Sequence, residues 1–172
     1  MCDKKHIDTI LESAEKQCKM RGVRFTLKRK IVLQGLIQSQ KALSAYELID
    51  FCKKEYGKVI AAMSIYRILE FLESQQLVHK LSLAKKYVAC SHINCEREHG
   101  VPQFLICNSC NKVKEIVIPP SVINGLQENA YSKGFKLVSP QIEMNCLCED
   151  CAKKADNYGE LTRSEKCATA VG

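Results

Sequence analysis

Four cysteines in two equally spaced pairs are the strongest indication of chemistry in this chain. Cys-x2-Cys occurs twice, with 37 residues between the pairs; its members are Cys107, Cys110, Cys148 and Cys151. Each pair brings two thiolates within reach of one ion, and two pairs complete a tetrahedral set of sulfurs around Zn²⁺. Such a closed set predicts a structural zinc site with no open position for a substrate. Cys146 lies two residues before Cys148 and is a rival ligand.

A second group of metal-ligand residues is spread over the middle of the chain. His79 and Cys90 are expected on the two strands of a hairpin with a turn centred near residues 84 and 85. Such a turn places them opposite each other, with their Cβ atoms about 5 Å apart. His99 and Glu115 would complete a mixed site that fixes the angle between two domains. The thiolate favours Zn²⁺ over Fe²⁺. A solvated histidine beside a core cysteine is the alternative interpretation, and two further residues remain rival ligands: His92 and Cys95.

The first half of the chain reads as helices followed by a hairpin. Apolar residues recur at helical spacing from Ile7 to Cys18, and further helices are expected from Thr26 to about Gln38, from the capping box at Ser44 onward, and over about 62–74. Strands over 77–81 and 86–90 flank a short polar turn. This order predicts a winged helix-turn-helix domain over 1–90.

The second half predicts a smaller α/β unit, so the fold class is α+β. Residues 91–102 are polar and predict a metal-binding linker between two domains. Strands are expected over about 103–107, 112–118 and 135–145, and a helix over 120–133 that begins at the Pro119-Pro120 pair. Residues 103–152 would form the second domain, and the polar residues 153–172 a disordered tail.

Charge and composition narrow the class of protein. The chain has 172 residues and a net charge of +7, with 17 Lys and Arg against 9 Asp and Glu in residues 1–90. A basic first half predicts contact with phosphate. The absence of an apolar run of membrane length or a cleavable leader predicts a cytoplasmic protein without a membrane partner. Eleven cysteines then indicate metal ligands rather than disulfides.

An enzymatic function is not expected. Zinc-dependent nucleobase deaminases need a His-x-Glu segment and a Pro-Cys-x2-Cys segment. Here Ile106 and Leu147 precede the two cysteine pairs, and no histidine is followed two residues later by glutamate. The sequence therefore predicts neither a catalytic residue nor a small-molecule substrate.

Several ordered motifs resemble the ferric uptake regulator (Fur) family, and most closely its zinc-responsive branch. The resemblance covers about residues 8–151, with Leu27 at a position where the family often has proline. The iron-responsive branch usually has a His-rich linker, which residues 91–100 lack. The matching segments are 23–26 (VRFT), 44–48 (SAYEL), 64–69 (SIYRIL), 77–80 (LVHK), 87–90 (YVAC) and both cysteine pairs.

The resemblance implies a dimeric repressor that binds double-stranded operator DNA. It implies an N-terminal winged helix, a C-terminal α/β dimerisation domain, and two Zn²⁺ ions per chain. The structural ion would lie on the four paired cysteines, and the regulatory ion on His79, Cys90, His99 and Glu115. One extra residue between His99 and Cys107 leaves His92 as the substitute for His99.

Candidate DNA contacts come from the helix over 62–74, the third helix, the hairpin and the start of the second helix. Arg67 and Tyr66 are expected on the exposed face of the helix over 62–74, where arginine can pair with guanine and tyrosine can touch a thymine methyl. Packing against the hairpin is the alternative role for Tyr66. The resemblance implies base contacts for Tyr46 and Arg67. Phosphate contacts are expected from Arg24, Lys28, Arg29, Lys80, Lys85 and Lys86.

Two other functions of the same general kind remain open. The first is an iron- or peroxide-responsive regulator, which metal competition during DNA binding would separate from a zinc-responsive one. The second is a thiol-based redox regulator. For that function Cys95 is the exposed candidate, since Cys18 and Cys52 are predicted to pack inertly on buried helix faces.

Overall fold

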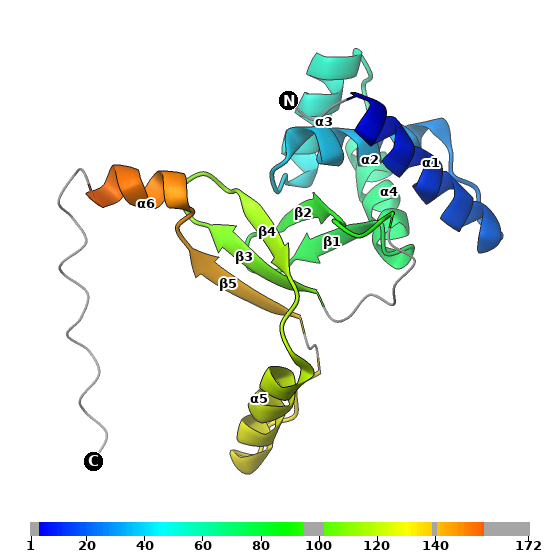
Figure 1. Cartoon of the computed structure of the whole chain (residues 1–172). Coiled ribbons are helices and arrows are strands. Elements are labelled where there is room, and N and C mark those ends of the chain that lie inside the picture. Colours follow the sequence, from blue (N-terminus) through cyan, green and yellow to red (C-terminus); the bar gives the residue numbers. More distant parts are fainter. Residues whose placement is uncertain (1–3, 95–101, 139–140, 157–172) are drawn as a thin grey trace.

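The structure is a computed structural model, which describes residues 4–94, 102–138 and 141–156. Figure 1 shows an N-terminal group of four helices and a hairpin beside a three-stranded sheet, with one helix at each end of that sheet. The predicted α+β class is confirmed. No helix in the described residues is both long and apolar enough to cross a membrane.

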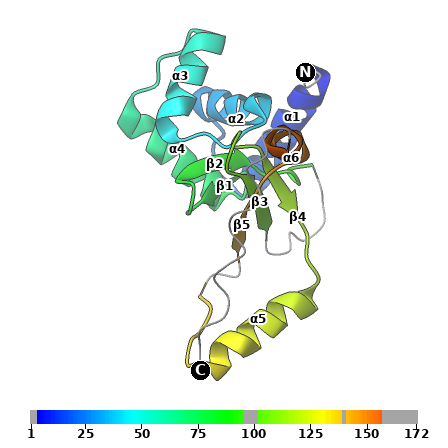
Figure 2. The same ribbon diagram turned by 90° about the vertical axis from the view of Figure 1, so that its left-hand side faces the viewer.

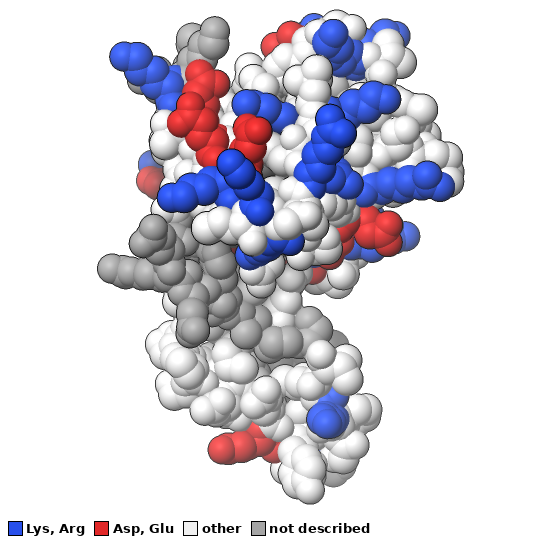
Figure 3. Space-filling view, turned by 90° about the vertical axis from the view of Figure 1, so that its right-hand side faces the viewer, with Lys and Arg blue, Asp and Glu red and all other residues white. Residues whose placement is uncertain are grey.

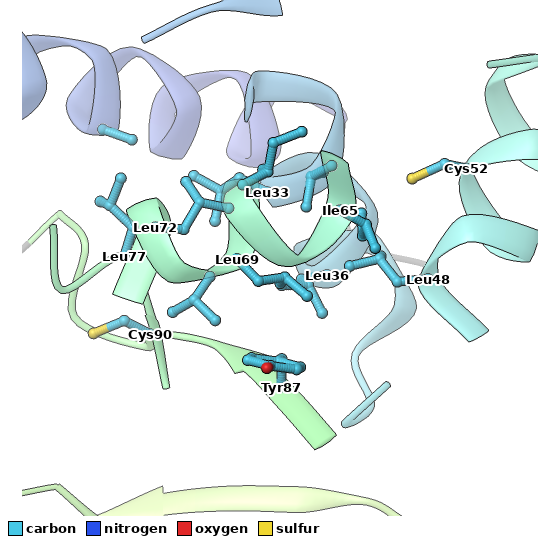
Figure 4. Close-up of a cluster of buried hydrophobic side chains, with 14 of the residues drawn as sticks. Leu33, Leu36, Leu48, Cys52, Ile65, Leu69, Leu72, Leu77, Tyr87 and Cys90 are labelled. Atoms are coloured by element: carbon cyan, nitrogen blue, oxygen red, sulfur yellow. The ribbon is translucent and has the colours of Figure 1, made fainter. Parts of the chain in front are cut away.

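The four N-terminal helices share one hydrophobic core. The helices are α1 (Lys4–Met20), α2 (Leu27–Ser39), α3 (Ala45–Tyr56) and α4 (Ala62–Ser74). Ile65, Leu69 and Leu72 lie on one face of α4 at helical spacing and are fully buried. Figure 4 shows side chains of α2, α3 and the hairpin meeting around that face. The sequence predicted all four helices, α1 and α4 from the spacing of apolar residues, α2 from its N-cap and α3 from its capping box, and for α4 the bounds agree.

Helix α3 begins at a complete capping box. The backbone N–H of Glu47 donates to Ser44 Oγ, and the backbone N–H of Ser44 donates to the Glu47 carboxylate at 2.7 Å. That backbone bond, helped by Lys86 Nζ at 3.0 Å, lowers the pKa of Glu47. The stabilisation is therefore present above the usual glutamate pKa and is lost as the pH falls through the lowered one. The same carboxylate links α3 to the hairpin.

Replacing Ser44 with alanine is expected to destabilise the protein by about 1 kcal/mol, because the N–H of Glu47 loses its acceptor. Thermal unfolding should show a midpoint lower by about 2–4 °C. Thr26→Ala is the matched control, since Thr26 holds the equivalent position of α2 without a side-chain cap bond. Equal shifts in the two variants would contradict a capping role for Ser44.

The hairpin consists of β1 (Val78–Leu81) and β2 (Lys86–Ala89). Its register places His79 opposite Val88, so the prediction that His79 faces Cys90 directly is wrong. The cause is the turn, which is centred between Leu83 and Ala84, one residue earlier than expected. Cys90 instead donates its N–H to the carbonyl of Leu77. It lies two residues beyond Val88, on the same face as His79.

The second sheet has the order β4-β3-β5. The central strand β3 (Gln103–Cys107) pairs antiparallel with β4 (Val113–Ile116) and parallel with β5 (Ile142–Cys146). The strand predicted from 135 is thus wrong at its start, since no strand partner reaches residues 135–138. Phe135 and Val138 are 71% and 94% exposed.

The last element of the described residues is a helix that was not predicted from the sequence. Helix α6 (Glu149–Asp156) continues past residue 153, so the start of the predicted tail is four residues too early. Two acidic residues in its first turn and two lysines in its last suit the helix dipole. Lys153 Nζ also lies 2.6 Å from the Glu149 carboxylate one turn earlier. Residues 157–172 of the predicted tail lie outside the described residues.

The hairpin and the sheet share a small core of their own. Leu81 of β1 packs with Phe104 and Ile106 of β3 and with Ala42, and all four are buried. The segment after β2 packs against the helical core instead, where Ile93 is buried. The carbonyl of Ile93 also accepts a hydrogen bond from the Gln17 side chain of α1 at 2.6 Å. The N-terminal unit therefore extends into the predicted linker.

Helix α5 (Pro120–Ser132) projects from the sheet and has no buried residue. Figures 1 and 2 show it standing apart from the rest of the molecule. Its apolar residues Ile123 and Leu126 line one side of an open groove of about 670 Å³. Leu83 of the hairpin turn and Ile142 of β5 line the other side. This face of α5 is apolar but uncovered within one chain.

Candidate metal centres

The four paired cysteines converge at one end of the sheet. Cys107 ends β3, Cys110 lies in the turn before β4, Cys148 follows β5 and Cys151 lies in α6. Their Sγ atoms all lie within 4.8 Å of one another, and those of Cys110 and Cys148 are 3.6 Å apart. Sulfurs of a tetrahedral Zn²⁺ site are separated by about 3.8 Å, as the usual Zn–S bond length requires. The donor set therefore fits this ion.

Local hydrogen bonds prepare one of these thiols to ionise. The backbone N–H of Cys148 donates to Cys107 Sγ at 3.3 Å and, with the N–H groups of Cys110 and Ser109, lowers the pKa of Cys107 to about 6. The Ser109 hydroxyl lowers the pKa of Cys151, but its bonds to neighbouring thiols, Cys148 first, outweigh this effect and raise that pKa to about 11. A cation at the centre would remove this opposition between the thiols.

Cys146 does not join this set. It sits opposite Cys107 in the parallel β3–β5 pair, and its Sγ lies 3.5 Å from the carbonyl oxygen of Ile106. The group of mutually close ligand atoms includes Cys148 and excludes Cys146. Of these two predicted rival ligands, the structure thus places only Cys148 with the other three cysteines.

A second group joins the hairpin to the sheet. The ligand atoms of His79 (β1), Cys90 (after β2) and Glu115 (β4) lie within 4.8 Å of one another. His79 and Cys90 meet because they are diagonal neighbours on one face of the hairpin, within reach of an imidazole. Cys90 is only 6% exposed, and the His79 ring lies 5.2 Å from that of Phe104. An imidazole, a thiolate and a carboxylate form a donor set that suits Zn²⁺.

Glu115 is the hub of this group. Its Oε1 lies 3.7 Å from His79 Nε2 and 3.1 Å from His92 Nδ1, and its Oε2 accepts from the backbone N–H of Ser91 at 2.9 Å. His92, one of the predicted rival ligands, is therefore adjacent to the site. The other two candidates from the linker, His99 and Cys95, lie outside the described residues.

The predicted base-reading residues lie on exposed surfaces. On α4, Arg67 and Tyr66 are exposed, Tyr66 by 43%, and Tyr46 at the start of α3 is 63% exposed. Met63, in the first turn of α4, is also exposed, by 71%. Figure 3 shows Lys and Arg gathered over the N-terminal part and few around α5.

Two of the residues predicted to contact phosphate make contacts within the protein instead. Arg24, Lys28, Lys80 and Lys85 are exposed. Lys86 instead pairs with Glu47 at 3.0 Å, and the Arg29 guanidinium stacks 3.3 Å above the ring of Phe71 and bonds to the carbonyl of Arg24. Arg29 thus fastens the start of α2 to α4, a role that its position in a basic run did not indicate.

The two thiols predicted on buried helix faces lie inside the protein. Cys18 and Cys52 are buried in the helical core, and burial raises the pKa of both, that of Cys52 to about 11. A buried neutral thiol reacts slowly. The prediction that they pack inertly agrees with this environment.

Comparison with known proteins identifies the family. The model of the "Ferric uptake regulator family" matches residues 20–145. The zinc uptake regulation protein of Escherichia coli is 34% identical over 144 residues, which are 84% of this chain and 82% of that protein. The solved structure of a zinc uptake regulator complexed with zinc and DNA has a TM-score of 0.73 at 30% identity, and covers 87% of this chain and 97% of that chain.

A second solved structure agrees with the first. Holo XcZur has a TM-score of 0.68 at 33% identity, with 84% of this chain and 98% of that chain covered. The region that the family model matches contains α4, the hairpin and nearly all of the second sheet. The chain therefore belongs to the ferric uptake regulator family, and it is a metal-responsive DNA-binding regulator and not an enzyme.

Proposed function

We propose that this protein is a zinc-responsive, sequence-specific repressor of zinc uptake genes, active in the cytoplasm as a metal-bound homodimer. Zinc uptake regulators among its relatives and structural neighbours support the metal and the target genes. The convergence of His79, Cys90 and Glu115 carries the proposal, because it ties the DNA-binding half to the sheet through a zinc-type donor set.

Each of the two metal groups has its own role. Cys107, Cys110, Cys148 and Cys151 would hold a structural Zn²⁺ that fastens α6 and β5 to β3. His79, Cys90 and Glu115 would hold the regulatory Zn²⁺, with His99 or His92 as fourth ligand. A bound ion supplies a crosslink between these segments, so zinc would fix the base of the hairpin against the sheet. Two ions per chain are expected.

Helix α5 supports the homodimer. Its exposed face and the groove beside it present Ile123, Leu126 and Leu137, an apolar surface that a monomer leaves in water. A second copy of the chain would bury this surface. The two reading helices would then meet successive half-sites of a duplex, as in other dimeric helix-turn-helix proteins.

The test is metal-dependent binding to a fluorescent duplex that the wild-type protein recovers from a random pool. Zn²⁺ is expected to restore binding after mild chelation has removed one of two zinc ions per chain. An iron- or peroxide-responsive regulator is the alternative, and restoration by submicromolar Fe²⁺ but not by Zn²⁺ would establish it. Unchanged binding after removal of the labile ion would exclude metal control altogether.

Replacing Arg67 with alanine is expected to relax base preference. Arginine pairs with both acceptors of guanine, so its loss should remove about 1–3 kcal/mol of discrimination at one base pair. The measurement is a titration of duplexes that differ by single base pairs. Lys85→Ala is the contrasting variant, expected to weaken all duplexes alike and to reduce the salt slope by about one. A uniform loss for Arg67→Ala would assign Arg67 to the phosphate backbone instead.

A further inference from the structure

Three residues form a row across the sheet, one on each strand. Phe104 of β3 is the register partner of Glu115 on β4 and of Glu143 on β5. Directly paired residues point to the same face of a sheet, so all three side chains face the hairpin. Glu115 belongs to the candidate regulatory site, and Phe104 packs on Leu81 of β1. Glu143, at the other end of the row, has no place in either metal group.

Glu143 binds the turn of the hairpin. Its Oε1 accepts from the backbone N–H of Ser82 at 2.7 Å, and its Oε2 accepts from the backbone N–H of Leu83 at 2.9 Å. The Gln141 amide donates to Glu143 Oε1 at 3.0 Å and to the carbonyl of Lys80 at 3.1 Å. We name this set of Glu143, Gln141, Ser82 and Leu83 the wing clamp. Two consecutive N–H groups on one carboxylate make charge-assisted bonds of the stronger kind.

The hairpin is therefore held to the sheet at both ends. Glu115 contacts its base, through His79 and the N–H of Ser91, and Glu143 contacts its turn. Between these points, Phe104 and Leu81 are fully buried against each other. The base contact depends on metal in the proposed function, whereas the turn contact uses protein groups alone.

We propose that Glu143 is a positioning residue for DNA binding, which anchors the hairpin turn so that its lysines meet the duplex in one fixed place. The proposal rests on the proposed function. Lys80 and Lys85 lie within three residues of the two clamped N–H groups, so a loose turn would spread them over many positions. The clamp and the regulatory metal also favour the same arrangement of hairpin and sheet. Loss of the clamp must then weaken metal binding as well, because coupling between two such sites is reciprocal.

The test replaces Glu143 with glutamine in the full chain. Glutamine keeps one acceptor but turns an NH₂ group toward the second N–H, and it removes the charge. At saturating Zn²⁺, the affinity for the duplex selected by the wild-type protein is expected to fall about tenfold. Zinc affinity of the labile site, measured by chelator competition without DNA, should fall several-fold. Glu12→Gln, at an exposed carboxyl on α1, is the matched control and should behave as wild type.

Two further readouts separate positioning from a merely structural role. Hydrogen exchange at the amides of Ser82 and Leu83 should accelerate in Glu143→Gln, while the tightly held zinc stays as in wild type and the melting temperature falls by no more than about 2–4 °C. Faster exchange with unchanged duplex affinity would overturn the proposal, as would loss of affinity together with the tightly held zinc. If the wild-type protein itself shows no zinc-dependent duplex binding, the proposed function fails, and the exchange data still report whether the clamp exists.

Discussion

Replacing Cys90 with serine is expected to abolish metal-dependent duplex binding while leaving the fold intact. Serine has nearly the same size as cysteine, but its neutral hydroxyl is a poor zinc ligand, so His79 and Glu115 would lose the thiolate between hairpin and sheet. Zinc content should fall from two ions per chain to one. Affinity at saturating Zn²⁺ should fall on the order of 100-fold, near the upper end of ordinary allosteric coupling.

The control for this variant is Cys146→Ser, which changes a half-buried thiol outside both metal groups. It should keep both ions and bind the duplex as wild type does. If Cys90→Ser retained the wild-type zinc titration of duplex affinity, Cys90 would be a core residue and not a ligand. Loss of both ions in Cys90→Ser would instead indicate that the variant is misfolded.

Replacing Cys107 with serine is expected to have the largest effect on stability. Cys107 ends the central strand, and its thiol has the lowered pKa, about 6, that favours a thiolate at neutral pH. Without it, three thiols remain to hold the structural ion, and the loss of that ion should cost several kcal/mol of folding free energy. Zinc analysis and thermal unfolding followed by circular dichroism measure the two effects.

The pH dependence of this site follows from the same shift. The thiolate of Cys107 is populated above a pH of about 6, and protonation competes with metal as the pH falls through that value. The zinc affinity of the wild-type protein should therefore weaken as the pH falls below this range, and release of the ion is expected at a lower pH, since bound zinc keeps the thiolate deprotonated. Full zinc content in Cys107→Ser, or a zinc affinity of the wild-type protein that does not change with pH, would exclude Cys107 from the ligand set.

The sequence predicted best what depends on neighbours along the chain. The bounds of α4 follow from apolar residues three and four apart, such as Ile65, Ile68 and Leu72. The capping box at Ser44 is a four-residue pattern, and the bonds it implies are present. The cysteine pairs work in the same way, since each Cys-x2-Cys turn places two sulfurs together before any tertiary contact forms.

Features that depend on strand register could not be predicted. The hairpin turn is one residue earlier than expected, and only the period of two along each strand kept His79 and Cys90 on one face. The parallel pairing of β3 with β5 joins segments far apart in sequence, so nothing local indicated that Glu143 would align with Phe104. The buried Gln103 side chain accepts from the N–H of Ile142 at 2.7 Å, and this contact could not be predicted for the same reason.

In the proposed homodimer, the exposed face of α5 would make the stability of each subunit depend on the concentration of the regulator. With no residue of that helix buried in a single chain, much of its order would come from a second copy, and mass action then governs how firmly each subunit is folded. Newly made chains at low concentration would be the least stable and the first exposed to proteolysis. Proteolysis would thereby set a minimum concentration below which this sensor does not persist in the cell.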